Sequence, residues 1–213
     1  MAKKDIALTK SKGGVIREYA ESIVVAILIA LFIRAFVVQA FKIPSGSMEP
    51  TLLIGDHLLV NKFIYGIKIP FIDHKVMVYK EPKRGDIVVF IFPKDKKKDF
   101  IKRVVGGPGD TVEIRQKKIY INGEHWDETF GVYRDAEVVG MVPRDNFGPV
   151  VVPPEHVFVM GDNRDRSYDS RFWGFVPFDQ IKGKALILYW SWNKLSGNVA
   201  EKVRFKSIGQ LIR

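Results

Sequence analysis

The sequence predicts a mainly β protein, with an N-terminal transmembrane helix followed by an all-β domain that carries a small β-extension. Two observations predict this architecture. Residues 22–33 form one uncharged apolar run of the kind found in membrane helices. After Pro44 the chain consists of short β-branched and aromatic runs separated by Gly, Pro, Asp and Asn, without a long stretch of helical periodicity.

The composition is that of a globular chain with a sizeable core. The 213 residues are 46% hydrophobic and 27% charged, which argues against disorder. Because the sequence contains no cysteine, disulfides, thiolate metal sites and cysteine catalysis are excluded. A formal net charge of +10 would suit nucleic acid, an anionic membrane or solubility. The sequence has no basic stripe interleaved with exposed aromatics, so we expect no nucleic-acid binding.

The first element is the apolar stretch, which continues past Arg34 to Phe41. It therefore reaches the roughly 20 residues that a helix needs to cross the hydrocarbon core. Arg34 lies near the far end, where its aliphatic stem can reach the interface. Because basic residues dominate the preceding segment, we expect a cytoplasmic basic tail over residues 1–18, a transmembrane helix over 19–40 and an extracytoplasmic domain over 41–213.

Two other interpretations of this stretch remain open. A cleaved signal peptide would also have a basic start and an apolar centre, and Val38-Gln39-Ala40 resembles a small-x-small cleavage site. A buried core helix is the second alternative. The late intrusion of Arg34 and Gln39 and the long basic region favour an uncleaved anchor.

Alternation and turn residues predict the strands of the following domain. The expected strands are residues 57–62, 86–92, 100–105, 111–114, 118–121, 157–160 and 185–189. Residues 111–115 and 118–122 alternate cleanly, as the strands of a half-buried hairpin should. Residues 124–149 are less patterned, and we expect them to form an insertion or extension of the sheet.

A serine-containing turn directly follows the apolar stretch. Residues 43–52 read Ile-Pro-Ser-Gly-Ser-Met-Glu-Pro-Thr-Leu, and Pro44, Gly46 and Pro50 restrict the backbone to a tight turn. A serine in such a turn projects its hydroxyl outward, as a nucleophile requires. Ser-Gly-Ser is also common in ordinary loops, so this motif needs support from a second one.

A serine nucleophile needs a general base, and a lysine is a stronger candidate than the four histidines. None of the histidines lies in a recognisable hydrolase context. Lys102 lies in an apolar strand with Phe100 and Val104 on its face, a setting that disfavours the charged amine and lowers its pKa. Arg103 has apolar neighbours in the same way, so alternation does not decide which of the two faces inward.

A dense polar loop follows the predicted strand that ends at Met160. Residues 161–171 read Gly-Asp-Asn-Arg-Asp-Arg-Ser-Tyr-Asp-Ser-Arg. A loop of this composition must satisfy its charges internally. It offers Asp–Arg pairs for rigidity and a serine hydroxyl that can orient a lysine amine.

With these motifs the chain resembles bacterial signal peptidase I from end to end. It shows a membrane anchor and then, in the order and spacing of that family, Ser-Gly-Ser-Met-x-Pro-Thr-Leu, Arg-Gly-Asp-Ile-Val-Val-Phe, Lys-Arg-Val-Val-Gly-x-Pro-Gly-Asp and Gly-Asp-Asn-Arg-Asp-x-Ser-x-Asp-Ser-Arg. The resemblance implies a serine–lysine dyad protease with an all-β catalytic core and a variable β-extension, here residues 124–149. It implies neither a metal nor a cofactor.

The resemblance also implies roles for individual residues. Ser47 would be the nucleophile and Lys102 its general base. The hydroxyl of Ser45 would join the backbone N–H of Ser47 in an oxyanion hole, and Ser167 would orient the Lys102 amine.

Other positions are implied to shape the site. Asp169 and Arg171 would hold the polar loop in its conformation. Small apolar pockets for the substrate would be lined by Phe41, Ile43, Pro44, Met48, Leu52, Leu58, Phe100 and Ile101. Simple core packing explains each of these eight residues equally well from sequence. Many proteobacterial members carry two membrane segments and a larger extension, which leaves the source lineage of this chain open.

The implied reaction is removal of N-terminal signal peptides from exported preproteins, after a small-x-small site, by acyl transfer. The implied partners are such preproteins and the lipid bilayer. The implied location is the bacterial cytoplasmic (inner) membrane, crossed once with the N-terminus in the cytoplasm. Two alternatives stay open: a relative dedicated to a single substrate, and a membrane-tethered β-domain that binds exported peptides without cleaving them.

Overall fold

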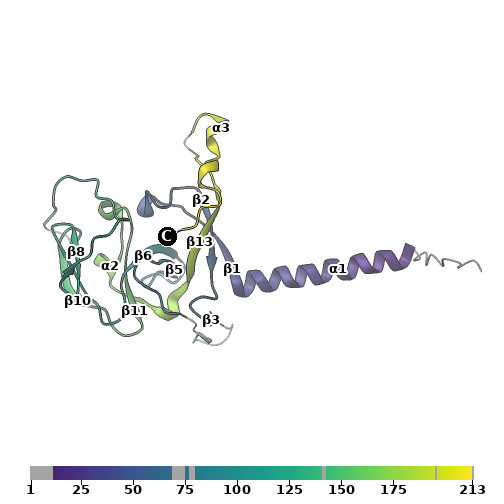
Figure 1. The fold of residues 1–213 in the computed structure, drawn as a ribbon, viewed down its shortest axis with the longest axis horizontal. Coiled ribbons are helices and arrows are strands. Elements are labelled where there is room, and N and C mark those ends of the chain that lie inside the picture. Colours follow the sequence, from purple (N-terminus) through teal and green to yellow (C-terminus); the bar gives the residue numbers. More distant parts are fainter. Residues whose placement is uncertain (1–11, 69–74, 77–79, 141–142, 195, 213) are drawn as a thin grey trace, which may run out of the picture. The chain divides into compact units, whose positions relative to one another are not determined.

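The protein is seen in a computed structural model, whose described residues are 12–68, 75–76, 80–140, 143–194 and 196–212. The chain forms two compact units, Met1–Val37 and Val38–Arg213. The first unit is helical and the second is built from β-strands (Figure 1). The expectation of a mainly β fold is therefore confirmed.

The N-terminal unit contains one long helix. Helix α1 spans Lys12–Phe32 and continues into a π-helical turn, η1, at Ile33–Val37. Eight large apolar side chains from Ile23 to Phe32 are between 53% and 60% exposed. Ala and Leu are strong helix formers, and residues 22–33 contain neither Gly nor Pro, so the sequence of this stretch suits a helix.

The helix differs from the predicted span of 19–40. It begins earlier, at Lys12, and helical structure ends at Val37. Residues Val38–Lys42 instead form strand β1, because their backbone groups pair with those of β2, Asp56–Asn61. Within the described part of the chain, no helix combines the length and the apolar character that crossing a membrane requires.

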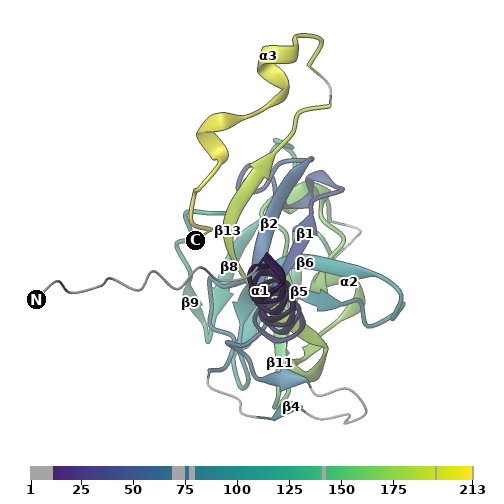
Figure 2. The same ribbon diagram turned by 90° about the vertical axis from the view of Figure 1, so that its right-hand side faces the viewer.

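The second unit is organised around a seven-stranded sheet of antiparallel neighbours, in the order β1-β2-β13-β5-β6-β11-β12. Strands β1, β2 and β13 lie side by side at one end of it (Figure 2). Besides β1 and β2, its strands are β5 Ile87–Ile91, β6 Asp99–Gly106, β11 His156–Met160, β12 Val176–Pro177 and β13 Ile181–Ser191.

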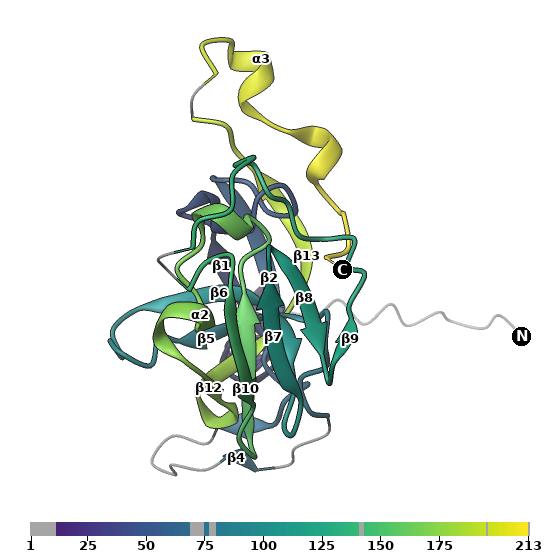
Figure 3. The same cartoon turned by 90° about the vertical axis from the view of Figure 1, so that its left-hand side faces the viewer.

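The expected extension belongs to a second, four-stranded sheet with the order β10-β7-β8-β9 (Figure 3). Its strands are β7 Thr111–Arg115, β8 Lys118–Ile121, β9 Glu124–His125 and β10 Phe147–Val151. The predicted β7–β8 hairpin is confirmed, with Val112 opposite Ile121. The chain leaves this sheet after β9 and returns to it as β10, which pairs with β7.

The remaining elements are short. A two-stranded ribbon is formed by β3 Ile67–Lys68 and β4 Lys75–Val76. Single turns of helix are η2 Gly46–Met48, η3 Arg164–Arg166, α2 Ser170–Trp173, η4 Phe178–Gln180, α3 Val199–Lys202 and η5 Phe205–Ser207.

Apolar clusters cover both faces of the seven-stranded sheet. On β5, alternate side chains point to opposite faces, so Val88 and Phe90 pack with Trp173 while Ile87 and Val89 join a different cluster. A third cluster includes residues of both the large and the small sheet: Val105, Val112, Ile114, Ile119, Ile121, Val152, Phe158 and Met160. Strand β6 is the neighbour of β5, so a side chain on either of its faces can be buried.

Candidate active site

The turn that carries Ser45 and Ser47 follows β1 directly and contains the single helical turn η2. Ile43 and Met48, 2% and 0% exposed, flank it and pack into the same apolar cluster. These buried side chains fix the backbone of the turn. Ser45 is left exposed and Ser47 half-buried, and both residues line a cleft.

Across this cleft lies the amine of Lys102, which strand β6 supplies. Its Nζ is 2.7 Å from the Oγ of Ser47 and donates a second hydrogen bond of 3.0 Å to the carbonyl oxygen of Ile101. The aromatic ring of Phe100 lies 5.5 Å from Nζ. Lys102 is only 4% exposed, although its side chain ends in a charged group when protonated.

This environment changes the acidity of the amine. Burial lowers the pKa of Lys102 from 10.5 to about 8; the charges of Asp169 and Asp162 oppose the change, and that of Arg171 favours it. An ordinary lysine is only about a thousandth neutral at pH 7.5, whereas a lysine with a pKa near 8 is roughly a quarter neutral. The pair can therefore transfer a proton from a hydroxyl to an amine near neutral pH.

The neighbouring Arg103 is also buried, at 0% exposure, on the opposite face of β6. Its guanidinium makes two hydrogen bonds to the carboxylate of Asp162, at 2.8 and 2.7 Å, and a third of 2.7 Å to the carbonyl of Gly85. It also lies 3.8 Å from the ring centroid of Phe130. Alternation left the choice between Lys102 and Arg103 open because both faces of β6 are covered. In the structure the arginine pairs with Asp162 and the lysine faces Ser47.

The polar loop, residues 161–171, meets the serine turn through two residues that sequence reasoning did not single out. The backbone N–H of Asn163 donates to the carbonyl of Ser47, and its Nδ2 donates to that of Gly46, both at 3.1 Å. Asp162 accepts a hydrogen bond from Thr51 as well as the two from Arg103. Because Asp162 and Asn163 directly follow an apolar strand, the sequence indicated that they could be buried. It did not indicate which groups they would contact.

Gly161 allows the loop to approach the turn closely. A Cβ at this position would overlap both the hydroxyl of Ser167 and the carbonyl oxygen of Ser47. The N–H of Gly161 donates a 3.1 Å hydrogen bond to Asp169, which fixes the glycine from the other side. No side chain fits here without displacing the turn or the loop.

Asp169 and Arg171 form a buried ion pair within the loop. Nε and one Nη of Arg171 donate to the two carboxylate oxygens of Asp169, at 2.8 and 2.9 Å. Burial alone would raise the pKa of Asp169, but the charge and hydrogen bonds of Arg171 outweigh it and lower the pKa. The pair can hold the loop in one conformation, as the resemblance implied.

The structure leaves two of the implied roles without direct contacts. Ser167 is 6% exposed, and its Oγ has no hydrogen-bond partner of ordinary geometry among the described residues, Lys102 included, although Asp169 is close enough for this hydroxyl to lower its pKa. Ser45 lines the cleft, and its side chain does not cap the helical turn η2. The orienting role of Ser167 and the oxyanion role of Ser45 remain predictions.

The cleft has a volume of about 620 Å³ and contains three of the eight predicted substrate-binding residues, Pro44, Phe100 and Ile101. The others do not line it. Phe41 is half-buried beside an apolar cluster, and the cluster's own buried members include Ile43, Met48, Leu52 and Leu58. These four residues are at most 2% exposed, as expected for core residues. From sequence alone, core packing and pocket lining were equally good explanations for them.

Several cleft residues were not expected from sequence. They are Glu49, Ile54, Asp99, Asn163, Arg166 and Tyr168. Two of these, Arg166 and Tyr168, are exposed members of the polar loop that alternate with buried ones. Across the described ranges of the chain, no three His, Asp or Glu side chains converge in an arrangement that could hold a metal ion.

Known proteins resemble this chain over most of its length. Residues 16–190 match the family described as signal peptidase, peptidase S26. Signal peptidase I of Pseudomonas aeruginosa is 40% identical in an alignment of 207 positions, which includes 82% of this chain and 72% of that protein. Signal peptidase I of Aquifex aeolicus is 39% identical in an alignment of 218 positions, which includes 78% of this chain and 80% of that protein.

A solved structure of a signal peptidase I from Enterococcus faecalis V583 matches with a TM-score of 0.41 and 34% identity, over 49% of this chain and 97% of the other. The assignment rests on the family match, which covers well over half of the chain, and on the sequence identity to the relatives. The chain belongs to the signal peptidase family, peptidase S26, and is an enzyme of the peptidase class.

Proposed function

We propose that this peptidase removes signal peptides from exported preproteins with a dyad of Ser47 and Lys102. The observation that carries the proposal is the 2.7 Å contact between Ser47 Oγ and the Nζ of a lysine that is only 4% exposed. A serine hydroxyl beside a base whose pKa lies near the working pH is the arrangement that nucleophilic catalysis needs. The names of the relatives supply the substrate class.

The reaction is an acyl transfer in two stages. Neutral Lys102 accepts the proton of Ser47 as Oγ attacks the scissile carbonyl carbon, which gives a tetrahedral oxyanion. The oxyanion accepts hydrogen bonds from the backbone N–H of Ser47 and the hydroxyl of Ser45. Lys102 then returns the proton to the leaving amine. In the second stage Lys102 accepts a proton from water, whose oxygen attacks the acyl carbon. As the bond between the acyl carbon and Oγ breaks, Lys102 returns this proton to Oγ, which releases the peptide and restores Ser47 and neutral Lys102.

The substrate class is supported by the walls of the cleft. Pro44, Ile54, Phe100 and Ile101 give it apolar lining beside the dyad. A shallow apolar wall accepts small side chains such as Ala on the acyl side of the scissile bond, which would select small-x-small sites. Asn163 and Gly161 hold the turn so that the attacking oxygen stays at this wall.

The proposal places the enzyme at the bacterial cytoplasmic membrane, with residues 1–18 in the cytoplasm and residues 41–213 outside. The support is the uncharged run at residues 22–33, the excess of basic residues before it, and the exposure of the apolar side chains between Ile23 and Phe32. A protease added to spheroplasts should digest the β-domain and leave an N-terminal tag intact. Protection of the β-domain would contradict this orientation.

The test of the activity is cleavage of a purified preprotein in detergent by the wild type and by Ser47→Ala. Only the wild type should release the mature protein, since the substitution removes the attacking oxygen and little else. Ser207→Ala, on the short helical turn η5, is the matched control and should cleave like the wild type. A Ser47→Ala enzyme with substantial turnover, or a wild type that only binds the preprotein, would refute the proposal.

A further inference from the structure

Several contacts join the β-extension to the polar loop, among them the buried ion pair of Glu128 with Arg164. One short piece of backbone, residues 131–135, which we call the linking segment, contributes most of those near Asp165. Val132 forms a parallel bridge with Asn163. Its N–H donates to the carbonyl of Asp162 at 2.8 Å, and its carbonyl accepts from the N–H of Arg164 at 3.0 Å. The polar loop therefore contacts the serine turn on one side and pairs with the extension on the other.

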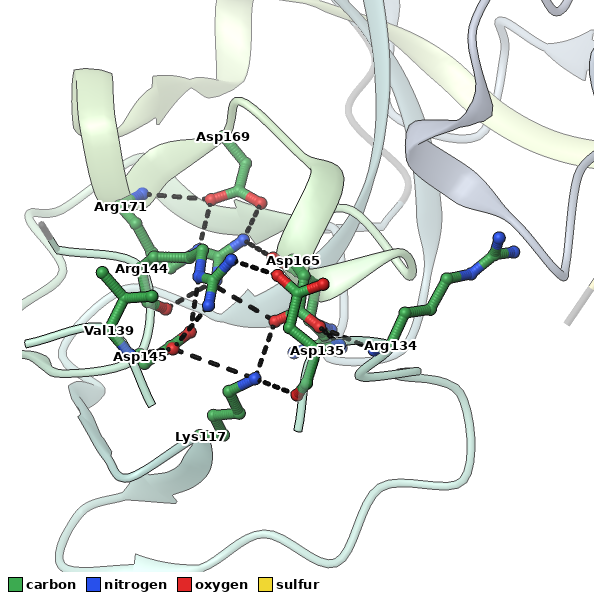
Figure 4. Close-up of polar contacts among 10 residues, drawn as sticks. Lys117, Arg134, Asp135, Val139, Arg144, Asp145, Asp165, Asp169 and Arg171 are labelled. Atoms are coloured by element: carbon green, nitrogen blue, oxygen red, sulfur yellow. Dashed lines mark hydrogen bonds and ion pairs between the residues drawn. The ribbon is translucent and has the colours of Figure 1, made fainter. Parts of the chain in front are cut away.

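Asp165 is the centre of this contact (Figure 4). One carboxylate oxygen of Asp165 accepts hydrogen bonds from the N–H groups of Arg134 and Asp135, at 2.6 and 2.8 Å. The other accepts from Nζ of Lys117 at 3.2 Å. The side chain of Asp165 is 0% exposed. Burial alone would raise its pKa, but these hydrogen bonds lower it, so the carboxylate is charged. Two of its three donors belong to the extension, and the third, Lys117, lies in the turn between β7 and β8.

Arg171 is joined to the extension as well. Its Nη1 donates a 2.7 Å hydrogen bond to the carbonyl of Arg144, a residue of the extension. The guanidinium of Arg144 in turn bonds Asp135 at 2.6 Å and Asp145 at 2.8 and 2.9 Å (Figure 4). The ion pair inside the polar loop thus has an external support in the extension.

A third contact reaches the serine turn itself. Arg134 donates to the carboxylate of Glu49 at 3.0 Å, and Glu49 follows Ser47 by two residues. The carboxylate of Glu49 also lies against the backbone at Gly46, where a Cβ would be 2.9 Å from Oε1. The linking segment therefore contacts both sides of the site, the serine turn through Glu49 and the polar loop through Asp165.

The burial of Lys102 depends on these two sides staying in place. The ionised groups that act on its amine are Asp169, Asp162 and Arg171, and all three lie in the polar loop. Its hydroxyl partner, Ser47, lies in the serine turn. If the loop moves outward, water reaches the amine and its environment becomes more like that of an exposed lysine.

We propose that Asp165 is a positioning residue, through which the β-extension holds the polar loop against the serine turn and keeps Lys102 buried. The inference rests on the proposed function. Asp165 touches neither Ser47 nor Lys102, so its effect on catalysis is indirect. The extension then has a catalytic task, in addition to completing the four-stranded sheet.

The first test is Asp165→Asn, assayed for preprotein cleavage from pH 6 to 10 in the full-length enzyme. The amide retains an acceptor for the two N–H groups but loses the charge that Lys117 contacts. We expect kcat to fall roughly tenfold or more at pH 7.5, since hydrogen bonds to charged groups are the strong ones. We also expect the rise of kcat/KM with pH to move toward alkaline pH, with partial recovery of activity there.

The matched control is Asp110→Asn. Asp110 lies in the turn before β7 and accepts 2.9 Å hydrogen bonds from Arg84, the N–H of Gly107 and Asn122, which are three donors outside the polar loop. It should keep the kcat and pH profile of the wild type. Wild-type kinetics in Asp165→Asn would overturn the inference, as would equal changes in both variants. A wild type that fails to cleave the preprotein would instead overturn the proposed function.

A second variant covers the case in which Asp165→Asn fails to fold. Arg134→Ala removes the partly exposed contact to Glu49, and Arg115→Ala, which removes the exposed pair with Glu113 on β7, is its control. Arg134→Ala should lower kcat roughly two- to fivefold and shift the pH profile in the same alkaline direction, with recovery in Arg134→Lys. If Arg134→Ala and Arg115→Ala both match the wild type, the inference is wrong.

Discussion

The Nζ of Lys102 and the Oγ of Ser47 lie 2.7 Å apart, although 55 positions separate the two residues in the chain. One comes from the middle of a buried strand and the other from a turn fixed by Ile43 and Met48. Because each side is held by apolar packing, the contact is preorganised before any substrate binds. Preorganisation of this kind lets the site avoid the cost of reordering during the reaction.

The pH dependence of cleavage should follow the titration of Lys102. Its pKa is lowered by burial to about 8, and the neutral amine is the active form, so kcat/KM should rise with pH through an apparent pKa near 8 and then level off. Lys102→Arg should be inactive throughout, since a guanidinium stays charged. The measurement is kcat/KM between pH 6 and 10. The proposed base would be contradicted if kcat/KM did not change with pH, or if it rose with the apparent pKa of an ordinary lysine.

The buried pair of Arg103 and Asp162 should control stability more than chemistry. Asp162→Asn leaves the guanidinium of Arg103 buried without its countercharge, which typically costs about 3–5 kcal/mol of the free energy of unfolding. Urea denaturation followed by tryptophan fluorescence measures this cost. The variant molecules that remain folded should show the same rise of kcat/KM with pH as the wild type. Burial is the largest influence on the pKa of Lys102, and the charge of Asp162 is a smaller one. Unchanged urea midpoints would show that the pair contributes no net stability.

The strands were largely predictable because most of them are bounded by turn residues and have one clear alternation. The seven expected strands all occur, within a few residues of their predicted ends. Strand β1 was missed because the apolar run continues into Val38–Lys42 without a compositional break. Strand β10 was missed because Gly148 and Pro149 lie in it, at a place where the pairing with β7 shifts register. Long-range pairing, which local patterns do not contain, decides both cases.

The site was predictable in part for a similar reason. The motifs marked Ser47, Lys102 and the polar loop, but Lys102 and Arg103 have equivalent neighbours in sequence, and only their partners distinguish them. The contact between the loop and the linking segment left no sequence signal, because it is made largely by backbone groups. Val132 bridges Asn163 through the backbone, and the carboxylate of Asp165 accepts from the backbone N–H of Arg134. Four of the eight residues expected in substrate pockets, Ile43, Met48, Leu52 and Leu58, are buried members of an apolar cluster, and their role as pocket lining remains a prediction.

The proposed oxyanion role of Ser45 predicts a specific kinetic effect. Ser45→Ala should lower kcat by about 10²–10³ and leave KM nearly unchanged, since the hydroxyl would donate only to the charge that forms in the transition state. The side chain is exposed and does not cap the helical turn, so the substitution should not affect folding. Steady-state kinetics on a peptide substrate test this. An unchanged kcat would mean that other groups form the oxyanion hole.

Gly161 should tolerate no side chain, even the smallest. A Cβ there would overlap the backbone carbonyl oxygen of Ser47 and the hydroxyl of Ser167, and it would lie 2.6 Å from the Cβ of Ser167, so rotation of that hydroxyl would not relieve the clash. Gly161→Ala must therefore displace the serine turn from the polar loop. Since a misplacement of about 1 Å can cost 10²-fold in rate, we expect kcat to fall by about that factor. Gly107→Ala is the matched control, because its Cβ would meet only Asp110, at 3.9 Å. Both variants should retain the far-ultraviolet circular dichroism of the wild type, and only Gly161→Ala should lose cleavage. Full activity in Gly161→Ala would show that the turn and the loop are not in the close contact on which the positioning of Ser47 depends.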